Sequence, residues 1–147
     1  MRQFINLIFI SSLLFSFNSF AKSPIYTGYF SSDAVSGYDT VAYFTQSKAV
    51  KGSKKFKYKY QGENWYFSSK AHLDLFTANP EKYAPQYGGY CAYAVAKNTT
   101  ASADPKQWTI EDGKLYLNYD ASIQKTWLQD NSGYIDKANQ NWPNVLN

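Results

Sequence analysis

The clearest pattern in the chain is an alternation of aromatic and lysine residues over 55–60, Lys-Phe-Lys-Tyr-Lys-Tyr. A period of two places the aromatic side chains on one face of a strand and the lysines on the other. The stretch 61–64 reads as a turn, and the aromatic stretch 65–67 reads as a second strand. The pattern therefore predicts a β-hairpin.

A helix is expected directly after this hairpin, over 69–78. The Ser68-Ser69 pair offers a hydroxyl that can cap its first turn, and Asn79-Pro80 ends it because the residue before a proline avoids the α region. Leu73 and Phe76 lie three residues apart and place an apolar stripe on one face.

The rest of the chain carries weaker signals, and together they indicate a small single domain of the α+β class. In it, two β-hairpins pack with the helix over 69–78 and with C-terminal helices. The further elements expected are a short strand over 25–30, a second hairpin with arms over 108–110 and 114–119 around the turn pair Asp112-Gly113, and helices over 121–129 and 134–141 with a break at Gly133. The segments 37–44 and 90–96 fit either a strand or a helical stretch.

Residues 1–21 have the pattern of an export signal. Arg2 precedes a mainly apolar run, and Ser19 and Ala21 supply the small residues that a signal peptidase requires. Serine and asparagine residues interrupt the run, which argues against stable membrane insertion. The sequence therefore predicts an exported, periplasmic protein whose mature chain, 22–147, forms one domain.

Composition narrows the classes of partner. The chain has a formal net charge of +4, and six of its lysines fall within 48–59. A run of this kind is typical of a solvated strand edge, and export removes the chain from cytoplasmic nucleic acid, so no nucleic-acid partner is expected. Aromatic residues make up 19% of the chain, which predicts a core built largely from rings.

The chain contains one cysteine, Cys91, and one histidine, His72. A single cysteine cannot form an internal disulfide, so Cys91 is a buried inert thiol, a reactive or metal-binding thiol, or half of an intermolecular bridge. The pair Gly88-Gly89 precedes it and lets another backbone approach closely, or leaves amides free to stabilise an anion. Soft-ligand or nucleophile chemistry in this chain would depend on Cys91, and on His72 if the two side chains meet.

Residues 65–83 resemble the core of the YHS domain family. In that family an aromatic strand end leads into a helix with a Phe and an Asn-Pro-x-x-Tyr end, positions taken here by Phe76 and by 79–83. Residues 39–42 resemble the upstream Asp-Pro-Val-Cys element of the family. The resemblance implies a domain core over 37–95, followed by a C-terminal extension over 96–147.

The resemblance also implies where a metal would bind, and this chain departs from the pattern there. Metal-binding relatives carry cysteines at positions that correspond here to Ala42, Ser68 and His72. A closed zinc site needs four nitrogen or sulfur ligands, which these residues cannot supply. Around Tyr-Gly-Gly-Tyr-Cys-Ala-Tyr-Ala-Val the chain resembles a branch of exported YHS-domain proteins in which selenocysteine can stand at the position of Cys91, which implies chalcogen chemistry there.

Three functions remain open, and the sequence leaves undecided whether the chain is an enzyme. The first is soft-metal binding, with Cys91 and His72 holding a copper-type ion as the cofactor. The second is a one-cysteine redox enzyme in which Cys91, assisted by His72, forms a sulfenic acid. The third is a non-catalytic module that binds a small ligand or a protein.

Other residues are candidates for supporting roles in these functions. Asp39 or Asp74 could be the acidic partner of His72. Ser68 is expected to be a helix cap, although a Ser68–His72 nucleophile pair is also conceivable. Three tyrosines near Cys91 are expected to anchor the core by hydrogen bonds, namely Tyr87, Tyr90 and Tyr93.

Overall fold

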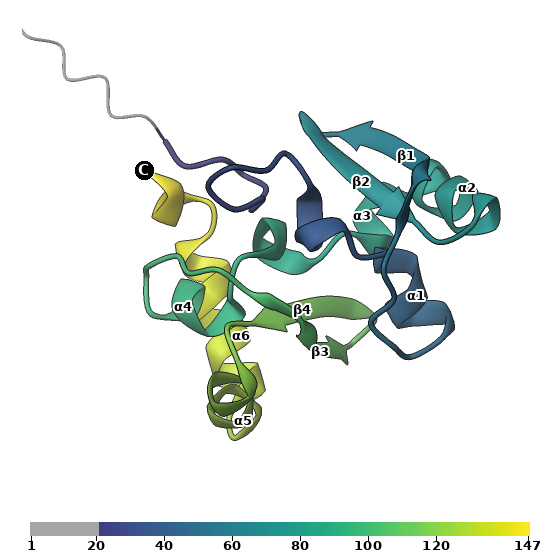
Figure 1. Ribbon diagram of the computed structural model, residues 1–147. Coiled ribbons are helices and arrows are strands. Elements are labelled where there is room, and N and C mark those ends of the chain that lie inside the picture. Colours follow the sequence, from purple (N-terminus) through teal and green to yellow (C-terminus); the bar gives the residue numbers. More distant parts are fainter. Residues whose placement is uncertain (1–20) are drawn as a thin grey trace, which may run out of the picture.

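The computed structural model describes residues 21–147, and the expected export signal lies outside them apart from its last residue. The protein is a small α+β domain containing two separate two-stranded antiparallel sheets (Figure 1). In chain order the elements are η1 (Ala34–Gly37), α1 (Thr40–Thr45), β1 (Ser53–Tyr60), β2 (Glu63–Phe67), α2 (Lys70–Ala78), α3 (Pro80–Tyr83), η2 (Gln86–Gly89), α4 (Ala92–Ala96), β3 (Asp104–Glu111), β4 (Lys114–Asn118), α5 (Ala121–Leu128), α6 (Asn131–Asn141) and η3 (Asn144–Leu146). The predicted fold class is confirmed.

Both predicted hairpins form, and each turns through two residues of positive φ. Gln61 and Gly62 connect β1 to β2 with φ of 49° and 83°, while Asp112 and Gly113 connect β3 to β4 with φ of 48° and 72°. Two consecutive positive φ values match the twist of the flanking strands, which is why Asp-Gly is a reliable signal. The first turn is shorter than the sequence indicated, because Glu63 and Asn64 already belong to β2.

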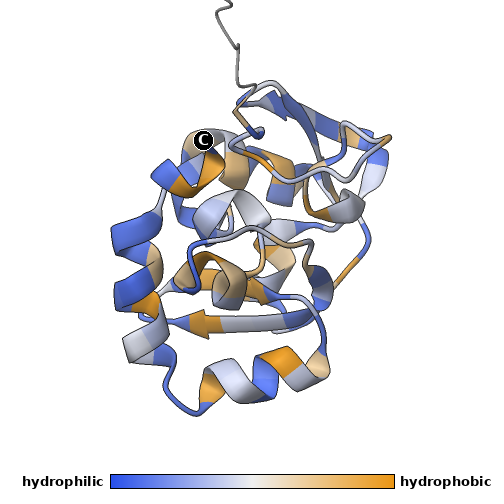
Figure 2. Ribbon diagram, turned by 90° about the vertical axis from the view of Figure 1, so that its left-hand side faces the viewer, coloured by the Kyte–Doolittle hydropathy of each residue, from blue (hydrophilic) through white to orange (hydrophobic). Residues whose placement is uncertain are grey.

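The first hairpin is amphipathic in the way its alternation predicts. Its lysines are exposed, which makes this hairpin a mainly hydrophilic ribbon at the top of Figure 2. Tyr60, Trp65 and Phe67 turn inward, toward Phe76 of α2. The ring of Phe76 lies 5.6 Å from that of Tyr60, 5.1 Å from Trp65 and 4.9 Å from Phe67. The expected core of rings is therefore present, and Phe76 is at its centre.

Strand β4 is buried on both faces and divides the core into two parts. Leu115 and Leu117 pack into a cluster with the first hairpin, α1 and α2. Tyr116 points the other way, into a second cluster with Trp127 of α5 and Ala138 of α6. Successive strand residues point to opposite faces, so one strand can serve both clusters. Figure 1 shows the result, with β3 and β4 between the first hairpin and the C-terminal helices.

The helix limits follow from capping, with one correction. Ser69 caps α2 by accepting from the amide of His72, and Asn79 ends it, as predicted. The predicted helix break at Gly133 is wrong, because Gly133 lies inside α6. This helix begins at Asn131, where the side chain of Asp130 caps it by accepting from the Gly133 amide. The ambiguous segments 37–44 and 90–96 are helical over most of their length, because α1 begins in the first and α4 lies in the second. Within residues 21–147, no helix is long and apolar enough to cross a membrane.

The expected strand over 25–30 is wrong, because this segment forms no ladder. Residues 22–29, here called the N-terminal strap, cross over η2 as irregular chain. The amide of Tyr26 donates to the carbonyl of Gly88 at 2.9 Å. Gly88 has φ of 61°, and a Cβ at this position would overlap the carbonyl oxygen of Pro24. Gly88 therefore permits the close backbone approach that the sequence suggested for the glycine pair, and the approaching segment is the strap.

Gly88→Ala should displace the strap, because the new methyl group meets a backbone atom as well as an unfavourable φ. We expect a loss of about 2–4 kcal/mol in unfolding free energy, measured by urea denaturation. Gly113→Ala is the matched control: its φ is also positive, and the space that its methyl group would enter is open, with no atom within 4 Å. The control should lose only about 1 kcal/mol, the cost of the left-handed conformation. Equal losses would contradict the steric role of Gly88.

Candidate functional site

The carboxylate of Asp39 is the centre of a buried polar cluster. It is fully buried and accepts five hydrogen bonds. Its Oδ1 accepts from the amides of Val41 at 3.0 Å and Ala42 at 3.2 Å, which caps α1. Its Oδ2 accepts from the amide of Ser68 at 2.8 Å, the hydroxyl of Ser68 at 2.6 Å and Nδ1 of His72 at 2.6 Å. One side chain thus connects α1, the end of β2 and α2.

His72 lies in this cluster with 9% of its surface exposed. Its Nδ1 donates to Asp39, since a carboxylate has no proton to give in return, and its Nε2 lies 3.2 Å from Oγ1 of Thr45. Of the two acidic partners expected for His72, the structure therefore selects Asp39. Asp74 instead forms an exposed ion pair with Lys70 at 2.7 Å.

Ser68 is not activated as a nucleophile by this arrangement. Its hydroxyl proton is directed at Asp39, and Nδ1 of His72 is engaged with the same carboxylate oxygen. Nucleophilic activation would require a ring nitrogen with a free lone pair to accept the hydroxyl proton. Ser68 therefore has a structural role, joining β2 to the cluster, while Ser69 supplies the helix cap.

The residues present do not fit the metal site that the resemblance implies. Ala42 has only a buried methyl group there, and Ser68 and His72 both bind Asp39. Nδ1 of His72 donates its proton to Oδ2 of Asp39 at 2.6 Å, so this nitrogen has no lone pair with which to bind an ion. In the described part of the chain, no group of three or more His, Cys, Asp or Glu side chains could hold a metal ion.

Cys91 lies at the N-terminal end of α4 and is 1% exposed. Its thiol donates to Oδ1 of Asn118, at 3.6 Å, and this oxygen also accepts from the amide of Tyr93, at 3.2 Å. Burial raises the pKa of Cys91, although backbone amides of Ala94, Tyr119 and Tyr93 act in the opposite direction. Desolvation is the largest effect, so the resting group is a neutral thiol. Asn118 is a polar contact of Cys91 that the sequence did not indicate.

The structure does not bring Cys91 and His72 together. The polar contacts of His72 come from α1 and β2, whereas those of Cys91 come from β4 and the start of α4. Figure 1 places α2 and α4 on opposite sides of the domain. The expected common pocket is therefore absent, and a joint site of these two side chains is not formed.

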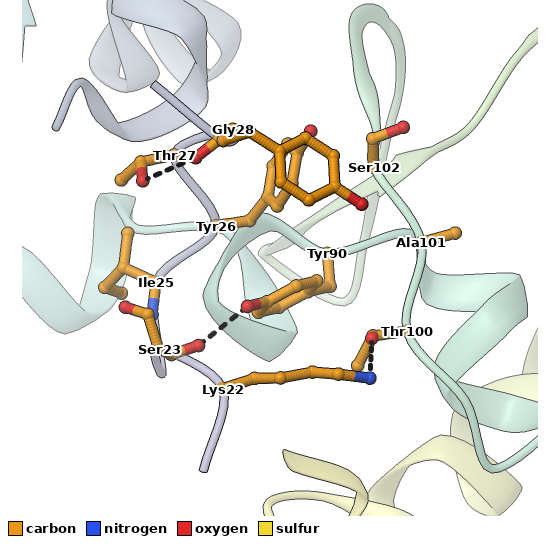
Figure 3. Close-up of a pocket in the computed structure, with 11 residues that line it drawn as sticks. Lys22, Ser23, Ile25, Tyr26, Thr27, Gly28, Tyr90, Thr100, Ala101 and Ser102 are labelled. Atoms are coloured by element: carbon orange, nitrogen blue, oxygen red, sulfur yellow. Dashed lines mark hydrogen bonds between the residues drawn. The ribbon is translucent and has the colours of Figure 1, made fainter. Parts of the chain in front are cut away.

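A pocket of about 380 Å³ opens between the N-terminal strap and the loop over 100–102 (Figure 3). The ring of Tyr90 lies at its centre, 5.3 Å from the ring of Tyr26, and the Tyr90 hydroxyl donates to the carbonyl of Ser23 at 2.8 Å. Burial and then the neighbouring Tyr26 raise the pKa of Tyr90, so this hydroxyl remains a donor. Lys22 closes one end, donating from Nζ to Oγ1 of Thr100 at 2.8 Å.

Most of these pocket residues were not found from the sequence. Tyr90 was expected as a core anchor, and it is one. The other two tyrosines also anchor the second cluster, since the Tyr87 hydroxyl donates to Oδ1 of Asn139 at 2.9 Å and Tyr93 packs against Tyr134 at 5.1 Å. Residues 22–29 and 100–102 have no periodicity or motif, and only their spatial proximity reveals the pocket.

Comparison with known proteins adds one finding. Residues 41–87 match the family model of the YHS domain. The match supports the resemblance to YHS-domain proteins that the sequence indicated. The family is associated with metal binding, and the matched segment contains Ala42, Ser68 and His72. No curated protein and no solved structure matches the chain.

Asp39→Asn should unfold the domain more easily, because one amide oxygen cannot replace a carboxylate that accepts five hydrogen bonds. Breaking a buried pair of this kind costs about 3 kcal/mol, and we expect a loss of this size in chemical denaturation. Asp74→Asn, which removes the exposed pair with Lys70, should cost about 0.5 kcal/mol or less. Similar losses for both variants would contradict the central role of Asp39.

The thiol of Cys91 should react slowly in the folded protein. Its raised pKa lowers the thiolate fraction at neutral pH, and burial blocks the reagent, so a disulfide reagent should react about 100-fold more slowly than with a free thiol. The rate should increase as the pH rises, and it should become fast in urea. Complete modification of folded protein within the mixing time at about pH 6 would show that the thiol is activated.

Proposed function

We propose that this chain is an exported YHS-domain module that binds a small organic ligand and requires no metal for folding or binding. The observation that carries the proposal is the pocket between the N-terminal strap and residues 100–102. Its volume of about 380 Å³ falls within the range of small-molecule sites. Export to the periplasm is part of the proposal, and it is supported by the pattern of residues 1–21.

The walls of the pocket support binding because they are fixed by contacts outside it. Lys22 donates from its amide to the carbonyl of Leu146 at 2.8 Å, and the amide of Tyr26 is held by Gly88. On the opposite wall, the carbonyl of Ala101 accepts from the amide of Cys91 at 3.0 Å. A site with walls fixed in advance loses little conformational entropy when a ligand binds.

Copper binding and thiol redox chemistry are less well supported by the geometry. A copper ion shared by Cys91 and His72 would need two side chains that lie on opposite sides of β4. Sulfenic acid formation would need oxidant to reach a sulfur whose residue is 1% exposed. The amides that face this sulfur favour a thiolate, but burial outweighs them. Neither activity has an accessible site comparable to the pocket.

Filling the pocket should abolish ligand binding without unfolding the domain. Ser102 lines the pocket and is half-buried, so Ser102→Trp should occupy its volume. We expect small organic compounds that stabilise the wild-type protein in a thermal-shift screen to have no effect on this variant. Ser122→Trp, on the exposed side of α5, is the matched control and should keep the wild-type response.

The screen has a clear negative outcome. If compounds that bind the wild-type protein stabilise Ser102→Trp equally, the ligand site lies elsewhere. If no compound stabilises any form, the proposal of a small-ligand module is wrong.

A further inference from the structure

The charge of the pocket lining is entirely positive. None of its lining residues is acidic, and its one cationic side chain is Lys22. Within residues 21–147, no carboxylate lies within ion-pair distance of Lys22. Its Nζ is engaged by a neutral oxygen, Oγ1 of Thr100, at 2.8 Å, which leaves two of its three protons free. The site is therefore complementary to a ligand that carries negative charge.

Hydroxyl groups next to this charge can also donate. Oγ1 of Thr100 accepts from Lys22, so its own proton is available to a ligand. The hydroxyl of Ser102 forms no hydrogen bond to another residue within 21–147 and lines the same wall. In Figure 3, Thr100, Ala101 and Ser102 follow one another along this wall, opposite the N-terminal strap. A carboxylate has two oxygens and could accept from both the ammonium group and a hydroxyl.

The rest of the lining is aromatic. The rings of Tyr26 and Tyr90 are inclined at 55° with centroids 5.3 Å apart, and Tyr29, which is 98% exposed, also lines the pocket. An exposed tyrosine ring at the edge of a pocket costs little entropy to order and offers a flat apolar face. Planar rings pack favourably on such faces.

From these observations we propose that the pocket binds a small aromatic carboxylate. The ring would pack against Tyr26 and Tyr29, and the carboxylate would accept from Lys22 and from the hydroxyl groups of Thr100 and Ser102. The volume of about 380 Å³ suits one or two fused rings. This assignment rests on the proposed function, because it names the ligand class of the same pocket.

Calorimetric titration of the protein, purified in the form that the cell produces, tests the assignment with matched probes. Indole-3-acetate carries a planar ring and a carboxylate; tryptophol keeps the ring without the charge; cyclohexylacetate keeps the charge without the planar ring. We expect indole-3-acetate to bind about tenfold more tightly than either of the other two probes. Tryptophol lacks the charge-assisted hydrogen bond and cyclohexylacetate lacks the ring stack, and each interaction contributes a difference of this size.

Variants identify the group responsible. Lys22→Met keeps the apolar stem, and it should lower the affinity for indole-3-acetate to that for tryptophol while leaving tryptophol binding unchanged. Lys57→Met, on the exposed strand β1, is the control and should change neither affinity. Thermal unfolding of each variant checks that the fold is intact.

The outcomes separate this inference from the proposed function. If tryptophol binds as tightly as indole-3-acetate, or if Lys22→Met leaves both affinities unchanged, the ligand class is wrong while the pocket remains a binding site. If none of the three probes binds, the assignment to aromatic carboxylates is overturned. The proposed function would then be tested independently by the response of Ser102→Trp in the wider screen.

Discussion

The domain depends on one buried carboxylate. Asp39 brings a negative charge into a region without solvent access, a cost that several strong donors must offset. Those donors are the first turn of α1, Ser68 at the end of β2, and His72 on α2. Because they come from three separate elements, the charge can be stabilised only when all three are in place. The carboxylate is therefore a constraint on tertiary structure as well as a helix cap.

This arrangement explains how the chain can keep a YHS-like segment without the metal ligands of metal-binding relatives. A metal ion joins elements by collecting ligands from each of them, and Asp39 joins the same elements by collecting hydrogen bonds. Ser68 and His72, which the resemblance equates with ligand positions, point at a common centre, and that centre is an oxygen atom of Asp39. A hydrogen-bonded carboxylate, unlike an ion, has no open coordination position, and the cluster supports the fold.

The second constraint is the two-sided burial of β4. Alternate side chains of this strand enter two different aromatic clusters, so elements that pack on one face are separated from those on the other. His72 belongs to the first side and Cys91 to the second, next to Asn118 of β4 itself. The pocket forms on the second side, where the N-terminal strap covers η2.

The sequence by itself determined the local elements whose signals are short-range. The alternation over 55–60, the Asp112-Gly113 turn, the Ser69 cap and the stop at Asn79-Pro80 each depend on neighbouring residues, and each is present in the structure. The sequence also indicated that Gly88 permits close backbone approach. It could not identify the approaching segment, because Tyr26 and Gly88 are far apart along the chain and meet only in the fold.

Only the tertiary structure determined which side chains lie close together. A lone cysteine and a lone histidine suggest a pair because both residue types are reactive, but reactivity carries no information about distance. The packing of β4 keeps them apart, and burial makes the cysteine a neutral thiol by raising its pKa. Likewise, Lys22, Tyr26 and Thr100 have no common pattern along the chain, and they form a pocket only because the strap folds back over Tyr90. Local patterns set the elements, and long-range packing determined which side chains meet.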